Sequence, residues 1–174
     1  WFKPNVIRRN IGPWRVNSPP VIIASTLFSL VDAGRPGLDK KEIRDRAIIV
    51  CPIDTPASRY AGFRFPGILR KHGISASPDK TDLWITGIEH FYCVNTSTMR
   101  LPKVYRLSDV VAECEIGQWY LASPIFWMRK RPFVFVARSK QFWDAEFHVC
   151  ELRIKNSRLI SGKLGKPLFV DVDR

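Results

Sequence analysis

The feature that most constrains the fold is a series of short apolar segments that begins at Ile88 and continues to the end of the chain. They are rich in Val, Ile, Phe, Tyr and Trp, and turn-forming residues separate them, as is typical of β-strands. The segments are IEHFYCV, KVYRL, VVAECEI, QWYLA, PFVFVA, EFHVCELRI and PLFVDV. They predict a mostly antiparallel sheet or a small barrel over residues 91–174. In EFHVCELRI the apolar positions change register, which predicts a β-bulge near Cys150 and Glu151.

The preceding part of the chain carries helix signals. An apolar stripe near the helical period predicts a helix over residues 19–33, with Gly34 as its end. Asp39 and Glu42 form a capping box for a second helix, DKKEIRDRA. The run AIIV at 47–50 either continues that helix or forms a short strand.

A third helix is predicted to begin at Thr55, a suitable N-cap, and to end at Gly73. A hairpin follows, with a turn at 77–80 and a strand at 83–85. Pro66 lies inside this helix and predicts a kink or two shorter pieces.

Three helices followed by a hairpin, over about residues 18–90, resemble the element order of a winged helix. The resemblance implies that the third helix enters a groove of nucleic acid and that the hairpin contacts its backbone. The expected fold class is therefore α+β, with N-terminal helices and a winged-helix-like hairpin. The expected organisation is an arm at 1–17, a helical part at 18–90 and a β-rich part at 91–174, with one core shared by the last two.

The chain is strongly basic. Its 174 residues include 28 Lys and Arg against 16 Asp and Glu, which gives a net charge of +12. Such an excess favours a polyanionic partner, because each neutralised phosphate releases counterions; solubility alone is the alternative explanation. No apolar run approaches the ~18 residues of a membrane span.

Candidate nucleic-acid contacts lie in the arm, the third helix, the segment WMRKRPF at 127–133 and the two cations that follow it at 138 and 140. In the arm, cations alternate with aromatic residues, and in WMRKRPF three consecutive cations lie between aromatic residues. Both patterns suit phosphate binding combined with base stacking. The alternatives are an arm that packs on the domain and a charged loop that protects strand ends. Further charge is spread along the segment 153–166. The candidate residues are Arg8, Arg9, Arg15, Arg59, Arg64, Arg70, Lys71, Arg129, Lys130, Arg131, Arg138 and Lys140.

Charge on several segments favours a non-catalytic component bound to RNA within a ribonucleoprotein particle such as an organellar ribosome, with neighbouring proteins as further partners. One alternative is a winged-helix DNA-binding protein that uses Arg59, Arg64 and Arg70. Their spacing does not place them on one helical face, which counts against it. Another alternative is a secreted, disulfide-bonded binding module or effector.

The oxidation state of the cysteines bears on whether the protein is intracellular or secreted. The four, Cys51, Cys93, Cys114 and Cys150, include no C-x-x-C pair, so neither a zinc site nor another metal site is expected. We favour reduced, buried thiols over two disulfides, because a chain of this length needs no covalent support. The chain begins at Trp1, as it would after removal of a transit peptide or a signal peptide. The sequon at Asn95 would matter only in a secreted protein.

Catalysis has weak support. His72, His90 and His148 have acidic or basic neighbours in the sequence and could run acid–base cleavage of RNA. Their spacing does not require it, and an isolated histidine in a strand is usually structural. No phosphate-binding glycine loop, nucleophile motif or cofactor motif is present in the sequence. We therefore expect no cofactor, and a ribonuclease is a minor alternative.

Overall fold

The computed structural model describes residues 5–6, 20–32, 46–52, 61–65, 73–98, 103–141 and 144–168. The chain divides into two units, Trp1–Ile74 and Ser75–Arg174, which are described separately. Among the described residues, no helix is long and apolar enough to cross a membrane.

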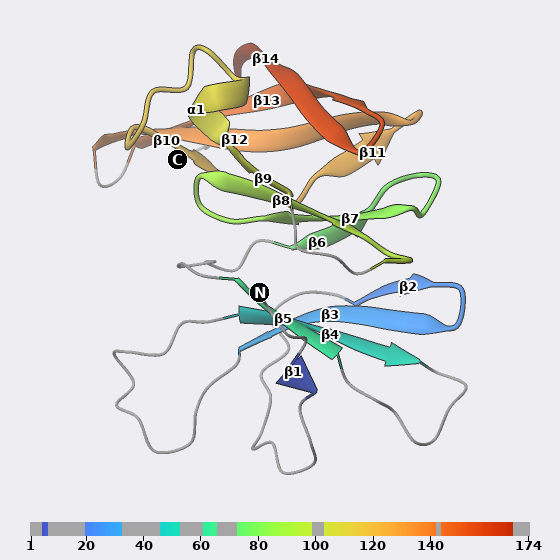
Figure 1. Ribbon diagram of the computed structural model, residues 1–174. Helices are drawn as coiled ribbons and strands as arrows, with labels where there is room; N and C mark the ends of the chain where they lie inside the picture. Colours follow the sequence, from blue (N-terminus) through green and yellow to red (C-terminus); the bar gives the residue numbers. More distant parts are fainter. Residues whose placement is uncertain are drawn as a thin grey trace, which may run out of the picture. The chain divides into compact units, whose positions relative to one another are not determined.

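The N-terminal unit contains an antiparallel sheet with the strand order β1-β5-β4-β3-β2 (Figure 1). The strands are β1 (Asn5–Val6), β2 (Val21–Ile23), β3 (Thr26–Asp32), β4 (Arg46–Pro52) and β5 (Ala61–Phe65). β2 and β3 form a hairpin in which Ile23 pairs with Thr26, and its turn includes Ala24 at a φ of +49°. Phe28 on β3 is buried.

This sheet occupies the region in which the sequence predicts helices, so the α+β fold class with N-terminal helices is wrong. The segment 19–33 contains the β2–β3 hairpin, because Val, Ile and Thr branch at Cβ and pack well on a pleated surface. The run at 47–50 is a strand within β4. The centre of the third predicted helix is β5. The winged-helix resemblance loses its basis with these helices, and the rest of the second and third falls outside the described residues.

The C-terminal unit contains two further sheets, and the unit boundary falls within β6 (Ile74–Ala76). The first sheet has the order β6-β7-β8-β9, with β7 (Asp82–Thr86), β8 (His90–Asn95) and β9 (Lys103–Arg106). The second has the order β10-β12-β13-β14, with β11 also paired to β12. Its strands are β10 (Trp119–Leu121), β11 (Phe126–Met128), β12 (Arg131–Gln141), β13 (Asp144–Lys155) and β14 (Arg158–Leu168).

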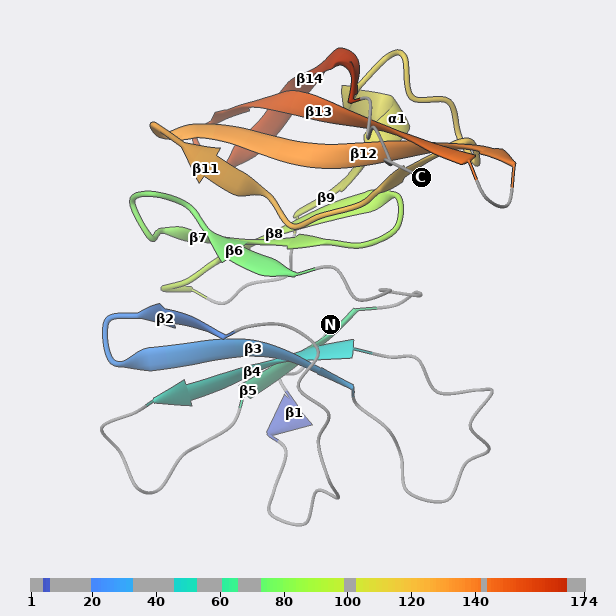
Figure 2. The same cartoon turned by 180° about the vertical axis from the view of Figure 1, so that it is seen from behind.

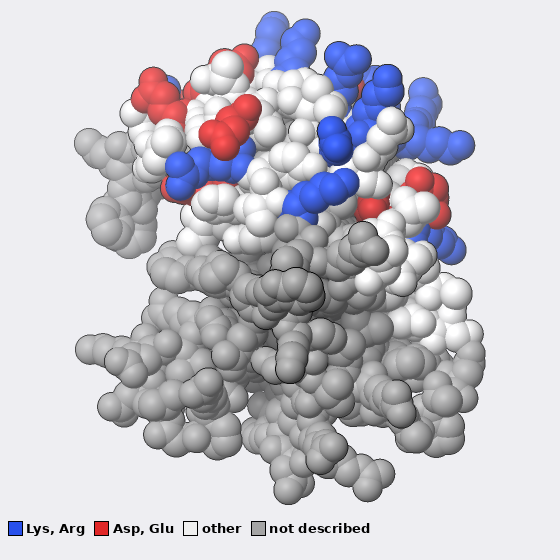
Figure 3. All heavy atoms as spheres, in the orientation of Figure 1, with Lys and Arg blue, Asp and Glu red and all other residues white. Residues whose placement is uncertain are grey.

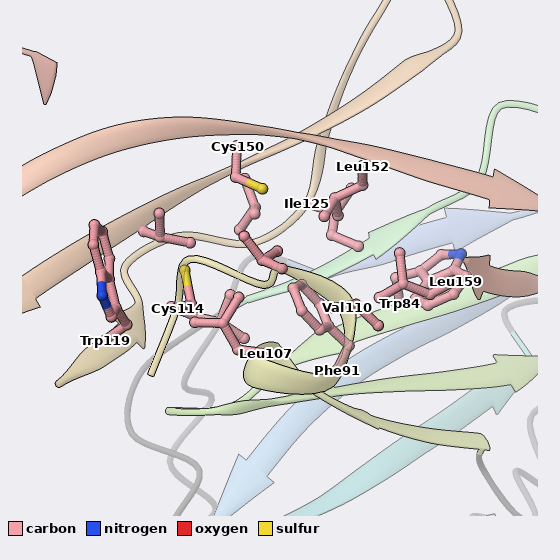
Figure 4. Close-up of a cluster of buried hydrophobic side chains, with 14 of the residues drawn as sticks. Trp84, Phe91, Leu107, Val110, Cys114, Trp119, Ile125, Cys150, Leu152 and Leu159 are labelled. Atoms are coloured by element: carbon pink, nitrogen blue, oxygen red, sulfur yellow. The ribbon is translucent and has the colours of Figure 1, made fainter. Parts of the chain in front are cut away.

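The two sheets of the C-terminal unit face each other, as opposite views show (Figures 1 and 2). The core between them takes side chains from both sheets and from the four-residue helix α1 (Leu107–Val110) (Figure 4). Trp84 and Phe91 come from the first sheet, and Cys150 and Leu152 come from the second. Along β12, β13 and β14 alternate side chains point into this core, so the opposite face of these three strands is an outer surface.

Most strands predicted for this unit are confirmed, and so is the hairpin whose turn precedes β7. The predicted bulge has a counterpart in β13, whose register with β14 shifts between His148 and Cys150. The predicted strand at 110–116 is wrong, because α1 ends there and turns follow.

Candidate nucleic-acid interface

The β11–β12 hairpin carries the cationic run singled out in the sequence. Met128 pairs with Arg131, and the two residues between them, Arg129 and Lys130, form the turn. Their φ angles are +48° and +66°, the left-handed values of a type I′ turn, which matches the twist of paired strands. Arg129, Lys130 and Arg131 are all exposed. The hairpin therefore presents three adjacent cations at its end.

The strand register extends this charge across the sheet. Val134 and Val136 point into the core, so Arg131 and Phe133 lie on the outer face of β12. Phe133 pairs with Glu151 on β13, and Glu151 pairs with Lys163 on β14. Arg153, two residues beyond Glu151, lies on the same face. Three neighbouring strands thus place cations on one surface.

The charged side chains on this surface line a groove of about 420 Å³. Four cations and one carboxylate contribute to its walls: Lys130, Arg131, Arg153, Lys163 and Glu151. The segment 129–166 as a whole holds ten Lys and Arg against three Asp and Glu. In the view of Figure 3, Lys and Arg side chains gather over this part of the unit. The groove is therefore a concentrated positive site within a basic surface.

The carboxylate in the groove neutralises one of its cations. The Nε of Arg131 donates to Oε1 of Glu151 at 2.8 Å, and its Nη2 donates to the same oxygen. Both side chains are exposed, at 63% and 38%, so this ion pair contributes at most about 1 kcal/mol to stability. The pairing also holds the guanidinium over the outer face. Its remaining N–H groups can still donate to an oxyanion.

A cluster of aromatic rings adjoins the cations. Phe126 stacks on Phe133 with ring centroids 5.9 Å apart and an interplanar angle of 23°. Phe126 also lies 5.1 Å from the ring of Phe135, and the guanidinium of Arg131 lies 5.6 Å from the ring of Phe133. All three rings are half-buried, and Met128 beside them is 53% exposed. Partly exposed rings beside cations form a surface on which a base can stack.

The other predicted contact residues are not brought to this groove. Arg138 is seven positions beyond Arg131 on β12, where its Nη2 donates to Oε1 of Gln118 at 3.2 Å. Its guanidinium also lies 5.7 Å from the ring of Trp119. Arg64 belongs to β5 and Lys140 to β12, but their side chains lie outside the described part. The predictions outside the described residues are Arg8, Arg9, Arg15, Arg59, Arg70 and Lys71.

Arg153, Lys163 and the Phe126–Phe133 stack belong to the site but were not predicted from the sequence. Arg153 and Lys163 appear in the sequence only as two of several cations spread along one segment. Pairing of β12 with β13 and of β13 with β14 is what brings them beside Arg131. The alternation in β13 could have placed Arg153 and Glu151 on one face, but not beside a particular neighbour.

Two of the three histidines, His90 and His148, lie in the described part of the chain, on β8 and β13. His148 is buried, with its Nδ1 2.9 Å from the carbonyl oxygen of Gly165 and its Nε2 3.1 Å from Oε1 of Glu146. Its ring also meets Trp119 edge to face, with centroids 5.1 Å apart. His90 lies on β8 beside the ring of Tyr92, and His72 lies outside the described residues. These contacts give His148 a structural role.

The described cysteines are buried free thiols. Burial raises the pKa of Cys93, Cys114 and Cys150 to about 12 each, and the Asp82 carboxylate adds to the effect at Cys93. At neutral pH these groups are protonated, which makes them poor nucleophiles and poor metal ligands. The described part of the chain contains no cluster of three or more His, Cys, Asp or Glu that could hold a metal. The side chain of Cys51 falls outside that part.

The side chain of Asn95 is hydrogen-bonded to two neighbouring turns. Its Oδ1 accepts hydrogen bonds from the backbone N–H of Ser97 and Thr98, and its Nδ2 donates to the carbonyl oxygen of Thr81 at 3.2 Å. The amide nitrogen that would carry a glycan is thus engaged in linking two turns.

No protein-family model, curated protein or solved structure matches this chain. The geometry of the groove and its surroundings is therefore the basis for a functional proposal.

Proposed function

We propose that the protein is a non-catalytic RNA-binding component of a ribonucleoprotein particle, and that it holds single-stranded RNA on the outer face of β11–β14. The observation that carries the proposal is the groove lined by Lys130, Arg131, Arg153 and Lys163 beside stacked phenylalanines. These cations would bind phosphates of the RNA backbone, and an exposed face of the phenylalanine cluster would accept a base. A protein embedded in RNA needs such surfaces rather than an enclosed catalytic cleft.

Single-stranded RNA is favoured over duplex DNA for two reasons. Half-buried phenylalanines on a sheet can stack only on bases that are not already paired. Cations on three neighbouring strands also form a broad surface, which suits a flexible single strand better than one groove of a DNA duplex, and the only helix among the described residues, with four residues, is too short to read that groove. Electrostatic binding to any polyanion would still give duplexes a weaker, sequence-independent affinity.

The proposal is tested by fluorescence anisotropy with a short single-stranded RNA, the same RNA as a duplex and a DNA duplex. The salt concentration is varied between about 50 and 200 mM, where phosphate contacts change affinity steeply. We expect the single strand to bind most tightly. The double variant Arg153→Gln/Lys163→Gln should weaken its binding about tenfold and reduce the salt slope by about 1.4, since each lost contact contributes roughly 0.7.

The matched control removes two cations elsewhere in the unit. Lys80→Gln/Arg106→Gln makes the same change in net charge and leaves the groove intact. We expect a loss of less than threefold. Equal losses from the two pairs would show that only total charge matters and would overturn the assignment to this face. Absence of binding by the parent protein at low salt would overturn the proposed function itself.

A further inference from the structure

The groove on the outer face of β12–β14 contains one group that phosphate binding does not explain, the carboxylate of Glu151. Glu151 lines the groove together with Lys130, Arg131, Arg153 and Lys163. It lies directly opposite Lys163 in the register of β13 and β14. A carboxylate at this position repels phosphates, so a groove for phosphates alone would be better served by a neutral residue. The carboxylate therefore calls for a partner of different chemistry.

The ion pair with Arg131 uses only one of the two carboxylate oxygens. The Nε and Nη2 of Arg131 both donate to Oε1 of Glu151. Among the described residues, Oε2 has no hydrogen-bond donor beside it. The side chain of Glu151 is 38% exposed, and Oε2 is not one of the enclosed polar atoms of the protein. An ionised carboxylate only accepts hydrogen bonds, so Oε2 is available to a donor on a ligand in the groove.

The strand register places a second acceptor near Glu151. Ser161 lines the same groove and lies opposite Arg153. Four side chains therefore form the corners of a rectangle on β13 and β14: Glu151, Arg153, Ser161 and Lys163. Neighbouring corners are about 5 Å apart across the strands and about 7 Å apart along them. The two cations occupy one diagonal, and the two residues that can accept a hydrogen bond occupy the other.

We infer that Glu151 accepts a hydrogen bond from the 2′-hydroxyl of a ribose, so that the groove selects single-stranded RNA over single-stranded DNA. The inference rests on the proposed function, because the cations would hold the backbone that presents the hydroxyl. In RNA every phosphate is attached to a ribose, and the 2′-hydroxyl of that sugar is the donor that DNA lacks. With Arg153 and Lys163 on phosphates, the hydroxyl of an adjoining sugar can reach Oε2 between them.

Glu151 would affect nucleic-acid binding in two opposite ways. Its negative charge weakens the binding of any phosphate chain, and this effect is the same for RNA and DNA. Its hydrogen bond strengthens the binding of RNA alone. The ratio of the two affinities isolates the hydrogen bond, because the effect of charge cancels. A charge-assisted hydrogen bond in a groove that is open to water should favour RNA about fivefold.

The test measures fluorescence anisotropy with three short single strands that carry the same base. They are oligouridine, oligodeoxyuridine and 2′-fluoro-oligouridine, which keeps the sugar pucker of RNA but has no hydroxyl to donate. All measurements use one salt concentration, because phosphate contacts make affinity depend on salt. We expect the parent protein to bind oligouridine about fivefold more tightly than either of the other strands.

Variants of the carboxylate test its role. Glu151→Met keeps a similar size but removes both the acceptor and the charge, so both strands should bind more tightly and the preference for oligouridine should disappear. Glu151→Gln keeps a neutral acceptor and should give an intermediate preference. The matched control is Glu113→Met, which makes the same charge change at an exposed position outside the groove and should leave the preference unchanged. Circular dichroism verifies that each variant is folded.

An unchanged preference in Glu151→Met would overturn the assignment, and so would an equal loss of preference in Glu113→Met. Binding of 2′-fluoro-oligouridine as tightly as oligouridine would attribute the preference to sugar pucker and overturn the role of the hydroxyl.

Failure of this inference differs from failure of the proposed function. Equal binding of oligouridine and oligodeoxyuridine by the parent overturns ribose recognition. The cationic groove then still stands if Arg153→Gln/Lys163→Gln weakens the binding of both strands. Absence of binding by all three strands at low salt overturns the proposed function, and ribose recognition with it.

Discussion

The inner and outer faces of the sheet formed by β12, β13 and β14 are made from the same strands but carry different chemistry. The inner face places Val134, Cys150 and Leu152 in the core with at most 3% exposure. The outer face places Arg131 and Lys163 on the groove, with the half-buried ring of Phe133 beside Arg131. Because side chains alternate along a strand, each neighbouring residue serves a different purpose. Substitutions on the inner face should therefore change stability, and those on the outer face should change RNA binding.

The largest expected effect concerns the buried thiols of the core, which should make the unfolding free energy fall at alkaline pH. The thiols of Cys93, Cys114 and Cys150 have a folded pKa of about 12 because they are buried, whereas the pKa of an unfolded thiol is about 8.5. The stability of the neutral thiols is fully present below the unfolded pKa and is lost as pH rises towards the folded pKa. We expect a loss on the order of several kcal/mol between about pH 9 and 12.

Urea denaturation at a series of pH values measures this effect. In Cys150→Ala, the decrease in unfolding free energy between about pH 7 and pH 11 should be smaller than in the parent protein. An unchanged decrease would contradict the contribution of this thiol.

The second test adds a methyl group at Gly162, where the inner face is tightly packed. A Cβ added at Gly162 would lie 2.5 Å from Cγ2 of Val111 and 2.9 Å from Sγ of Cys150. Gly162→Ala should therefore lower the unfolding free energy by about 1–3 kcal/mol in urea denaturation. In a protein that already carries Val111→Ala, the same Gly162→Ala substitution should cost less stability, because the methyl group that it would meet is gone. Ser161→Ala, at the adjacent outer-face position, should change stability by less than about 0.5 kcal/mol.

These inner-face tests also show which parts of the fold the sequence could predict. Strands such as β12 and β13 are long and rich in Val, Phe and Ile, so their type was predictable. The segment around α1 was not recognised, although Leu107, Val110, Val111 and Cys114 are all buried at helix-like intervals of three and four. Its β-branched residues predicted a strand, whereas the spacing of its apolar residues by three and four was the better signal in the sequence.

The N-terminal error has a different cause. β2 and β3 turn at Ala24, which adopts a φ of +49° without being Gly, Asn or Asp. Because no residue marked the turn, two short apolar strands had the pattern of one amphipathic helix. The candidate site was predictable only at Arg129–Arg131, which are adjacent in sequence. Arg153 and Lys163 join them through strand pairing, which no local pattern specifies.

A third test addresses the rings of the outer face. Phe133→Leu keeps an apolar side chain of similar size but removes the stacking surface. We expect it to cost about 1–2 kcal/mol of binding free energy for single-stranded RNA, measured by fluorescence anisotropy. Stability should fall by less than about 1.5 kcal/mol. A loss of stability without any loss of binding would place Phe133 with the inner-face residues.

The last test compares two hairpin turns and has the smallest expected effect on stability. The β11–β12 turn is Arg129–Lys130 and the β13–β14 turn is Asn156–Ser157, and all four residues have positive φ. Asn suits this conformation, whereas Arg and Lys are strained in it. Replacing Arg129 and Lys130 by Asn and Gly should raise the unfolding free energy by about 1 kcal/mol and weaken RNA binding severalfold.

The matched control is Ser157→Gly in the other turn. It should raise stability slightly, by about 0.5 kcal/mol, and leave RNA binding unchanged. Both effects are measured by urea denaturation and anisotropy. Unchanged RNA binding after loss of Arg129 and Lys130 would mean that the strained turn is not retained for its charge.

The position of β14 has a consequence for self-association. It is the last strand in the described order of its sheet, and it carries Lys163, Lys166 and Pro167 along its length. A terminal strand offers unpaired backbone groups to a second copy, and Lys and Pro on such a strand oppose that pairing. Pro167 cannot donate a backbone hydrogen bond. Pairing the β14 strands of two copies edge to edge would also bring lysines together, and their like charges repel. β14 should therefore keep concentrated protein from assembling into extended intermolecular sheets.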